Sequence, residues 1–268
     1  MSFVVLRAVG LVTVQDLGRL GRMHEAVPPG GALVRDRLVA ANRAVHNPDD
    51  AAAIEVLGQL VIRAEQALEV ATDTSDARVL AAGDELTVTS EPRRVAYLAV
   101  RGGIAAPLVL GGRGALLSAG LGSMIRAGQT FAADALARAA PAARAPRRAS
   151  KRTDDPASAP IRLLAGPDPD HFAPGALDLL VSSDYRILPS SNRVGTRLDG
   201  PALPRTSAPE VSRPMVIGAV EVPRDGKPIV LGPEHPTTGG YPVIAVVATA
   251  DLGRLFSIRL GGTVRFTR

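Results

Sequence analysis

Residues 219–248 read AVEVPRDGKPIVLGPEHPTTGGYPVIAVVA and contain three short apolar runs, at 219–222, 229–231 and 243–248. Each run is rich in Val, Ile or Ala, and Gly and Pro stand in the segments between them. Short runs of this composition, bounded by turn-forming residues, are typical of β-strands. The stretch therefore predicts three strands of a mainly β protein.

The same pattern recurs in the rest of the chain. The sequence has 27 Gly and 22 Pro and only 3% aromatic residues, which favours many short strands packed through Val, Leu, Ile and Ala. Further strands are predicted at 3–9, 58–64, 68–72, 86–90, 95–100, 161–164, 185–188 and 263–266.

Helices are expected to be few and short. One amphipathic helix is predicted over 34–46, where apolar residues recur every three or four positions and Asn47-Pro48 follows. A short helical turn is predicted at 251–256, with Asp251 as its cap. The buried stripe of the first helix is expected to comprise Val34, Leu38, Ala41 and Val45.

Two domains are predicted. Residues 138–159 are rich in Ala, Pro and basic side chains and show no pattern of buried positions, which is typical of a linker. This leaves an N-terminal β-rich domain at 1–137 with one amphipathic helix, and a C-terminal domain resembling a β-barrel at 160–268. Both have an ordinary domain size.

The positive charge of the chain, net +5 with a pI of 10.3, is concentrated in one segment. Six of the 31 basic residues lie in 138–152, and the remaining 25 nearly balance the 26 acidic residues. The folded domains are therefore not expected to bind nucleic acid, for which a basic face and interleaved aromatic residues would be needed.

Single features of the composition exclude other kinds of site and other classes of protein. The absence of cysteine excludes disulfides, zinc–thiolate centres and thiol nucleophiles. With only two lysines, Lys151 and Lys227, a Schiff-base or phosphate-loop lysine is not expected. No apolar run approaches the roughly 20 residues of a membrane span, and the N-terminus lacks a signal-peptide pattern. A cytoplasmic protein without membrane contact is therefore expected.

Residues 188–200, LPSSNRVGTRLDG, are the first candidate site, because they gather Asn192, Arg193 and Arg197 around Gly195. In an extended segment Arg193 and Arg197 share one face, with roughly 13 Å between them, and in a helix their i,i+4 spacing also brings them together. Two guanidinium groups suit a carboxylate, a carbamate or a phosphate. The alternative is a solvated strand whose arginines pair with acidic neighbours such as Asp199 or Asp184.

Two further clusters place polar side chains where core packing does not require them. One, at 13–19, is followed by a Pro-Pro-Gly-Gly turn. The other, at 237–242, offers hydroxyls, bare glycines and a phenol, with Glu221 on a strand facing the same region; its alternative is a β-turn with a packed tyrosine. The candidate residues of these clusters are Gln15, Asp16, Arg19, Thr237, Thr238, Gly239, Gly240, Tyr241 and Glu221.

Several other motifs do not match the sequence patterns of known functional sites. Gly111-Gly112-Arg113-Gly114 lacks the Gly-Lys-Ser/Thr ending of a phosphate loop, and a flexible turn is favoured. No G-x-S-x-G elbow is present. The four histidines show no metal-ligand spacing, so no metal site is predicted, and 168–171 is interpreted as a turn initiated by proline.

Motifs along nearly the whole chain resemble the Kip antagonist and allophanate hydrolase subunit 2 family. This group includes the C-type subunit of 5-oxoprolinase and the second part of the urea carboxylase carboxyltransferase domain. The resemblance rests on Val14-Gln15-Asp16-Leu17-Gly18-Arg19, Pro28-Pro29-Gly30-Gly31-Ala32, Ala41-Asn42-Arg43, Asn47-Pro48, Glu55, Arg101-Gly102-Gly103-Ile104, Ser191-Asn192-Arg193, Gly195, Arg197-Leu198, Gly200, Val222-Pro223, Asp225-Gly226, Pro228-Ile229-Val230-Leu231 and Thr237-Thr238-Gly239-Gly240-Tyr241-Pro242.

The resemblance implies a mainly β architecture with a cyclophilin-like barrel. It also implies a B-type partner subunit, similar to the Kip inhibitor or allophanate hydrolase subunit 1, with an A-type 5-oxoprolinase subunit or a biotin carboxylase as a further component. Family members hydrolyse 5-oxoproline to glutamate with ATP or transfer a carboxyl group from carboxybiotin to an amide-like substrate. No cofactor is assigned to this chain alone.

The chain departs from the family pattern at positions expected to face a ligand. Val34 stands where the family has an acidic residue, and Val243 stands where it has a lysine. Gly112-Arg113-Gly114-Ala115 replaces a Ser-Arg-Ser-Thr run. Glu221 and Pro236 stand where glutamine is usual. The substrate of other family members is therefore not assumed to be the substrate of this chain.

The leading hypothesis is a C-type subunit of a complex that acts on an amide or lactam. Arg193 and Arg197 are expected to hold a carboxylate, and Asn192, Thr237, Thr238 and Tyr241 to add neutral hydrogen bonds. Glu221 or Asp16 is the expected proton acceptor. The rival hypothesis is a non-catalytic protein that binds a partner similar to the Kip inhibitor, which the lost polar groups favour.

Overall fold

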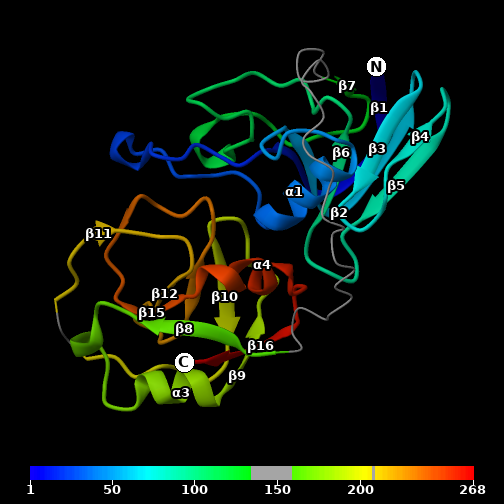
Figure 1. The fold of residues 1–268 in the computed structure, drawn as a ribbon. Coiled ribbons are helices and arrows are strands. Elements are labelled where there is room, and N and C mark those ends of the chain that lie inside the picture. The colour runs from blue at the N-terminus through cyan, green and yellow to red at the C-terminus, as the bar shows by residue number, and fades with distance from the viewer. Residues whose placement is uncertain (134–158, 207–208) are drawn as a thin grey trace. The chain divides into compact units, whose positions relative to one another are not determined.

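The computed structural model describes residues 1–133, 159–206 and 209–268. They group into two compact units, coloured along the chain in Figure 1. The first unit contains Met1–Gly21 and the described residues from Pro29 to 133, and the second contains Arg22–Pro28 and the described residues from 159 onward. The predicted linker lies, apart from residue 159, outside the described residues, so the domain limits 1–137 and 160–268 stay predictions.

The first unit is built on a seven-stranded sheet with the order β4-β3-β6-β2-β1-β7, in which β5 also pairs with β2. All of its pairs are antiparallel, and the register of β1 against β2 runs from Phe3 opposite Ala64 to Gln15 opposite Ala53. Gln15 is thus fixed at the end of the longest pairing. The strands are β1 (Ser2–Gln15), β2 (Ala53–Ala64), β3 (Leu68–Thr72), β4 (Arg78–Leu80), β5 (Glu85–Thr89), β6 (Ala96–Val100) and β7 (Thr130–Ala132).

Helix α1 (Arg35–Ala44) packs against β6, β3 and β2. The predicted apolar stripe is confirmed, since Val34, Leu38, Ala41 and Val45 are all buried. The segment after the helix is tied to β6, because Asn47 Nδ2 donates to the Val100 carbonyl at 2.8 Å. Two short 3₁₀ turns complete the chain up to residue 133, η1 (Met23–Glu25) and η2 (Leu117–Ala119).

The second unit is a closed seven-stranded barrel with the order β10-β13-β12-β15-β8-β16-β9. The parallel pair is β8 with β16, and the other barrel pairs are antiparallel. This architecture confirms the mainly β fold and fits the cyclophilin-like barrel that the resemblance implies. The barrel strands are β8 (Ile161–Ala165), β9 (Asp184–Ile187), β10 (Gly195–Asp199), β12 (Ala219–Glu221), β13 (Ile229–Leu231), β15 (Val243–Val247) and β16 (Thr263–Thr267).

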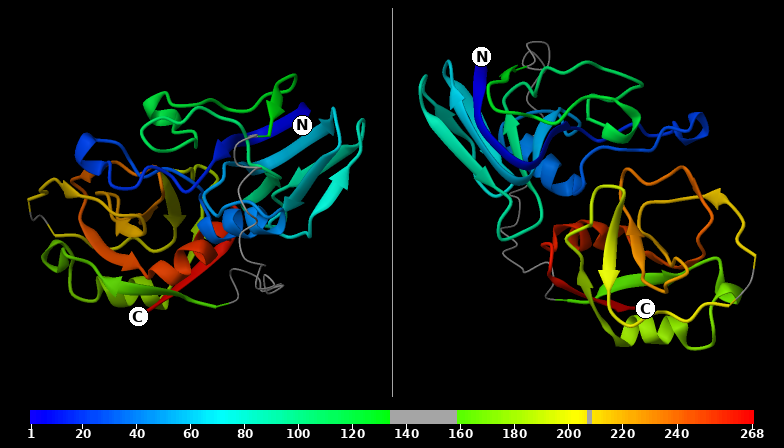
Figure 2. Two further views of the ribbon diagram at one scale, coloured as in Figure 1. Left: turned by 45° about the horizontal axis from the view of Figure 1, so that its top comes forward. Right: turned by 180° about the vertical axis from the view of Figure 1, so that it is seen from behind.

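Short elements decorate the barrel. Helix α3 (Ala176–Ser182) packs on β16 and runs along the outside of the barrel, and α4 (Thr249–Ser257) packs on β8 (Figures 1 and 2). A two-stranded sheet pairs β11 (Arg213–Pro214) with β14 (Thr238–Gly239). The turn predicted after Asp168 is η3 (Pro169–His171).

The alternation of side chains on the barrel strands decides which residues face outward. Thr196, Leu198, Val220 and Val230 are fully buried, whereas Arg197, between two of them on β10, is exposed. Alternate positions of a strand point to opposite faces, so Arg197 projects from the outer face of the barrel.

Most predicted strands are confirmed with small shifts of their ends, and 68–72 and 229–231 are unchanged. The strands predicted at 3–9 and 58–64 are longer in the structure, at Ser2–Gln15 and Ala53–Ala64. The prediction that Asp251 caps a helix is wrong. Helix α4 begins after Ala248 without a side-chain cap, and Asp251 Oδ2 instead accepts hydrogen bonds from the backbone N (2.9 Å) and Nε (2.8 Å) of Arg162. The Arg162 guanidinium lowers the pKa of that carboxyl. Among the described helices, none has the length and hydropathy to cross a bilayer.

Candidate functional site

Three neighbouring barrel strands carry a row of side chains that contains two predicted site residues. Arg197 on β10 lies opposite Ile229 on β13, and Ile229 lies opposite Glu221 on β12. Residues directly opposite each other in antiparallel pairs share one face of the sheet. Arg197 and Glu221 therefore lie on the same outer face, with the half-buried Ile229 between them.

Glu221 has the properties of a proton acceptor. Its side chain is half-buried, and burial raises the pKa of its carboxyl, while the positive charge of Arg197 opposes this shift. A carboxylate whose pKa is raised toward the working pH takes up a proton more readily than an exposed one. The row thus combines a cation and a basic carboxylate on one surface.

Arg193 does not join this row, so the prediction that Arg193 and Arg197 project together is wrong. The side chain of Arg193 is only 3% exposed, and its Nε donates to Oε1 of the buried Glu234 at 2.6 Å. The chain turns before β10, because Asn192 Oδ1 accepts hydrogen bonds from the backbone N of Val194 (2.9 Å) and Gly195 (3.2 Å). This turn breaks the alternation that would have placed both guanidinium groups on one face.

The predicted Thr237–Tyr241 cluster lies beside Glu221. The backbone N of Val222 donates to the Pro242 carbonyl at 3.0 Å, and Glu221 is paired with Val243. Thr238 is exposed and Tyr241 is 43% exposed, so the alternative of a packed tyrosine does not hold. These hydroxyls reach solvent next to the row.

An ion pair between the half-buried Arg213 and the buried Asp168 supports this cluster. Arg213 on β11 pairs with Oδ1 of Asp168, whose Oδ2 accepts a hydrogen bond from the backbone N of Val243 at 2.8 Å. Gly239 on β14 is close to Met215, since a Cβ there would lie 2.6 Å from Met215 Cε. Asp168 therefore has a structural partner, and the predicted turn at 168–171 is the 3₁₀ turn η3.

His235 is a buried group that the sequence interpretation missed. Its Nδ1 lies 2.7 Å from the Pro236 carbonyl, an acceptor, so Nδ1 carries the proton and Nε2 keeps its lone pair. Burial lowers the pKa of the imidazole. Nε2 is buried and has no hydrogen-bond partner within the described part of the chain. The available signal was a Glu-His pair between Pro233 and Pro236 in an otherwise apolar stretch.

We expect His235 to be neutral near neutral pH and protonated only at Nδ1. The Pro236 carbonyl requires the Nδ1 proton, and burial disfavours the imidazolium. Nitrogen-15 NMR of the ring resolves the two nitrogens, with His235→Asn as the assignment control. An Nε2–H tautomer, or a pKa above the ordinary value of about 6.5, would contradict the structure.

The predicted residues of the first unit form a separate cluster at the end of β1. Asp16 Oδ1 accepts a hydrogen bond from the backbone N of Gly18 at 2.8 Å, and Oδ2 accepts one from the backbone N of Arg113. Arg19 donates through Nε to the Val109 carbonyl (3.0 Å) and through Nη2 to the Gly112 carbonyl (3.3 Å). These contacts join the loop after β1 to the glycine turn at 109–114.

Two polar atoms in this cluster lack a partner. Gln15 Nε2 donates to Thr13 Oγ1 and to the Ala115 carbonyl, both at 3.1 Å, but Gln15 Oε1 and Arg19 Nη1 are buried without a hydrogen bond in the described residues. Buried polar atoms are nearly always satisfied by protein, water or ligand. Gln15 and Arg19 therefore keep an acceptor and a donor available, whereas both oxygens of Asp16 are engaged.

The glycines of the turn permit its close approach to β1. A Cβ on Gly112 would lie 2.9 Å from Arg19 Cγ, and one on Gly114 would lie 2.8 Å from both Asp16 Oδ1 and Gln15 Oε1. The serines of the family pattern at these positions would not fit the observed packing. The two glycines are thus coupled to the positions of Gln15, Asp16 and Arg19.

Replacing Gly114 by Ser is expected to destabilise the protein by about 1–3 kcal/mol, since the new Cβ overlaps two buried side chains. Urea unfolding measures the change, and Gly240→Ser is the control, because a Cβ there meets nothing within 4 Å. Equal unfolding midpoints for the two variants would show that Gln15 and Asp16 move aside freely.

The glycine turn does not resemble a phosphate cradle in the structure. Its backbone N–H groups are used internally: Gly112 N donates to the Val109 carbonyl, Ala115 N to the Val14 carbonyl, and Arg113 N to Asp16. A phosphate loop instead directs its N–H groups at the ligand. The turn therefore does not fit ATP. The described residues also contain no group of three or more His, Asp or Glu side chains arranged to hold a metal ion.

Comparison with known proteins finds relatives that match most of the chain. The family model of the carboxyltransferase domain, subdomains A and B, matches residues 25–268. The C-type subunit of 5-oxoprolinase from Escherichia coli (strain K12) is 33% identical over 98% of this chain and 90% of its own length. Urea amidolyase of Lachancea kluyveri is 27% identical over 99% of this chain but only 17% of its own length.

A solved structure shares the architecture. The crystal structure of TTHA0988 superimposes with a TM-score of 0.86 at 28% identity and covers 100% of this chain. This chain spans 55% of the length of TTHA0988. The described fold thus also occurs as part of longer chains.

Proposed function

Because the chain belongs to the family of the carboxyltransferase domain, subdomains A and B, we propose that it is the C-type subunit of an enzyme complex that acts on an amide or lactam. The best single reaction is the ATP-dependent hydrolysis of 5-oxoproline to glutamate. The observation that carries this choice is the 33% identity to the C-type subunit of 5-oxoprolinase over 90% of that protein. The urea amidolyase relative matches over only 17% of its length.

The Arg197–Glu221 row supports a catalytic role for this chain. Arg197 is exposed and suits a substrate carboxylate, which 5-oxoproline carries. Glu221 is the better of the two candidate proton acceptors, because its pKa is raised by burial, whereas both Asp16 oxygens accept backbone hydrogen bonds. Thr237, Thr238 and Tyr241 supply hydroxyls beside them.

The remaining predicted residues have supporting roles in this proposal. Gln15 and Arg19 stay candidates for substrate binding within the first unit, because each keeps a buried polar atom without a partner in the described residues. Asn192 shapes the turn before β10, Arg193 holds Glu234, and Gly239 and Gly240 let the chain approach the ligand. ATP is proposed to bind to a partner subunit, since the glycine turn of this chain does not fit it.

Reconstitution tests the proposal. The chain is co-expressed in the cytoplasm with a B-type subunit and an A-type 5-oxoprolinase subunit. The B-type subunit is one similar to the Kip inhibitor or to allophanate hydrolase subunit 1. Glutamate formation and ATP hydrolysis that depend on 5-oxoproline and on this chain are expected. Turnover of carboxybiotin with a biotin carboxylase in place of the A-type subunit would instead establish carboxyl transfer.

The second candidate is a regulatory protein without chemistry of its own. It is favoured by the loss of polar groups at Gly112, Gly114, Ala115, Pro236 and Val243 relative to the family pattern. A tight complex with the B-type subunit that remains inert toward 5-oxoproline, carboxybiotin and a panel of amides would support this candidate. Activity that requires Glu221 would exclude it.

A further inference from the structure

The Arg197–Glu221 row presents two opposite charges on one face of the barrel. Arg197 is exposed and Glu221 is half-buried, and both project outward on either side of Ile229. Adjacent strands lie about 4.8 Å apart, so the Cα atoms of the two charged residues are about 10 Å apart across β13. A ligand that lies over Ile229 is therefore within reach of a cation on one side and a carboxylate on the other.

Both charges of this row are unpaired in the described part of the chain. The side chains of Arg197 and Glu221 make no hydrogen bond or ion pair there. Asp199, two positions after Arg197 on the same face of β10, is instead paired with Lys227, whose Nζ lies 3.0 Å from Asp199 Oδ1. The row thus leaves Arg197 and Glu221 available to a ligand.

The half-buried position of Glu221 favours a ligand that carries a positive charge. Burial disfavours the carboxylate form and raises the pKa of Glu221, and the positive charge of Arg197 opposes this shift. A cation in hydrogen-bond contact would stabilise the carboxylate further. A ligand with a carboxylate alone would satisfy Arg197 but bring a second negative charge toward Glu221. The row therefore suits a ligand that carries both charges close together.

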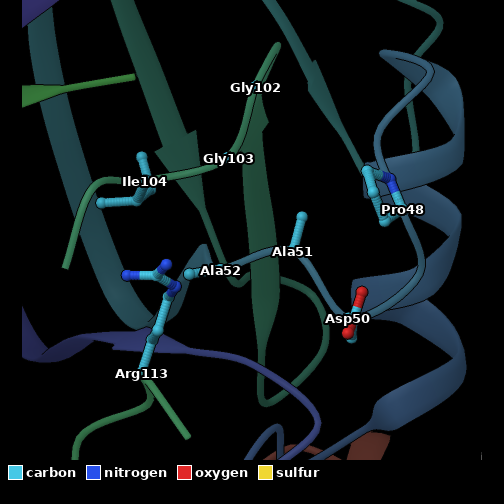
Figure 3. Close-up of a pocket in the computed structure, with 8 residues that line it drawn as sticks. All are labelled: Pro48, Asp50, Ala51, Ala52, Gly102, Gly103, Ile104 and Arg113. Atoms are coloured by element: carbon cyan, nitrogen blue, oxygen red, sulfur yellow. The ribbon is translucent and has the colours of Figure 1, made fainter. Parts of the chain in front are cut away.

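A cavity in the first unit also has opposite charges in its walls but does not offer a comparable site. It has a volume of about 160 Å³, and Figure 3 shows Asp50 and Arg113 among its lining residues. Arg113 is engaged by the protein, since its Nη1 donates to the Ala106 carbonyl and its backbone N donates to Asp16. The barrel row is therefore the better candidate for a ligand of mixed charge, and Asp50 provides a control position.

The reaction proposed for the complex creates such a ligand. The nitrogen of 5-oxoproline lies in an uncharged lactam, so this substrate presents only its carboxylate as a charge. Hydrolysis breaks the lactam C–N bond: the oxygen of water ends on the carbonyl carbon, which becomes a second carboxylate, and the two hydrogens of water end on the nitrogen. The product, glutamate, carries an ammonium beside the original carboxylate, and the coupled hydrolysis of ATP does not alter this balance.

We propose that the Arg197–Glu221 row binds the zwitterionic α-amino acid group of glutamate and holds the product more tightly than it holds 5-oxoproline. The α-carboxylate pairs with Arg197, as the carboxylate of the substrate does, and the newly formed ammonium pairs with Glu221. Glutamate then competes with 5-oxoproline for Arg197 and inhibits the complex. The identity of the ligand rests on the proposed function, whereas the affinity of the row for an α-amino acid does not.

Binding is measured with the purified full chain by isothermal titration and by NMR, without partner subunits or ATP. The ligands are L-glutamate, glutarate, which lacks the ammonium, and 4-aminobutyrate, which lacks the α-carboxylate. We expect L-glutamate to bind about tenfold or more tightly than either analogue, because each analogue loses one charge-assisted contact. Glutarate that binds as tightly as L-glutamate, or no binding of L-glutamate at all, would overturn the proposal.

Matched variants locate the binding at the row. Glu221→Gln is expected to weaken L-glutamate binding about tenfold or more without weakening glutarate binding, and Arg197→Met is expected to weaken both. Asp199→Asn, on the same face of β10, and Asp50→Asn, in the first unit, each remove an exposed acid and should bind as the unmodified chain does. L-Glutamate binding that is unchanged in Glu221→Gln would contradict the proposal.

Inhibition of the reconstituted complex separates this proposal from the proposed function. L-Glutamate is expected to inhibit the consumption of labelled 5-oxoproline competitively, and glutarate to inhibit it about tenfold more weakly. A complex that consumes 5-oxoproline but is not inhibited by L-glutamate well above the KM for 5-oxoproline would overturn the proposal and leave the proposed function standing. A complex without turnover, whose isolated chain binds L-glutamate through Glu221, would overturn the proposed function and leave the amino-acid site standing.

Discussion

Replacing Glu221 by Gln is expected to lower kcat of the reconstituted complex by about 10²- to 10⁴-fold, the usual contribution of a positioned general base. Glutamine is usual at this position in the family, so the variant also tests whether this chain uses a base of its own here: an undiminished kcat would show that the reaction needs no proton acceptor at position 221. Gln keeps the shape of the side chain and its place beside Ile229 but cannot accept a proton. The fold should be retained, because Glu221 is half-buried and makes no ion pair among the described residues. The measurement is steady-state glutamate formation by a complex in which the presence of every component has been verified.

The pH dependence of kcat/KM distinguishes a proton acceptor at position 221 from a merely structural residue. Burial raises the pKa of Glu221, so the acid limb of kcat/KM is expected above the ordinary glutamate value of about 4.3. Below that limb the carboxyl is protonated and turnover falls. Glu221→Gln should remove the limb together with the activity.

Arg197 provides the matched test of the same row. Its positive charge lowers the pKa of Glu221, so Arg197→Met is expected to move the acid limb to higher pH and to raise the KM for 5-oxoproline. Because Arg197 is exposed, the variant is expected to fold as the unmodified protein does. A Glu221→Gln complex with full activity and an unchanged acid limb would move the proton acceptor elsewhere, with Asp16 as the next candidate.

The strands were predictable because their signal is local. The runs at 229–231 and 68–72 are short, apolar and bounded by turn residues, and they appear unchanged in the structure. Glu221 and Arg197 were also found from the sequence, Glu221 as a charged residue in an apolar run and Arg197 as one of the polar side chains gathered around Gly195. Their common face, however, follows from the pairing of both strands with β13, which local spacing does not reveal.

Side-chain partners far away in the chain were not predictable from local patterns. Arg193 resembles Arg197 in its neighbourhood, yet Glu234, 41 positions later, draws it into the interior. Asp16 is likewise engaged by the backbone of Arg113, 97 positions away. Such contacts depend on tertiary structure rather than on spacing.

Arg193→Met is expected to destabilise the protein by about 3–5 kcal/mol, the usual result of leaving one member of a buried ion pair alone. Arg193 is 3% exposed and Glu234 is 7% exposed, and the variant removes the 2.6 Å contact between them. Glu234 would then remain buried without this cation. The unfolding midpoint in urea measures the loss, and Arg197→Met, at an exposed position, should change stability by no more than about 0.5 kcal/mol.

The double variant separates a structural role of Arg193 from substrate binding. Removing both charges, as in Arg193→Met with Glu234→Met, is expected to recover most of the lost stability, because two apolar side chains replace an ion pair at little cost. If the double variant folds stably and the complex retains turnover, Arg193 is a structural partner of Glu234 and does not bind substrate. If Arg193→Met unfolds at the same urea concentration as the unmodified protein and loses only activity, the side chain binds substrate and the buried pair is not its main contribution.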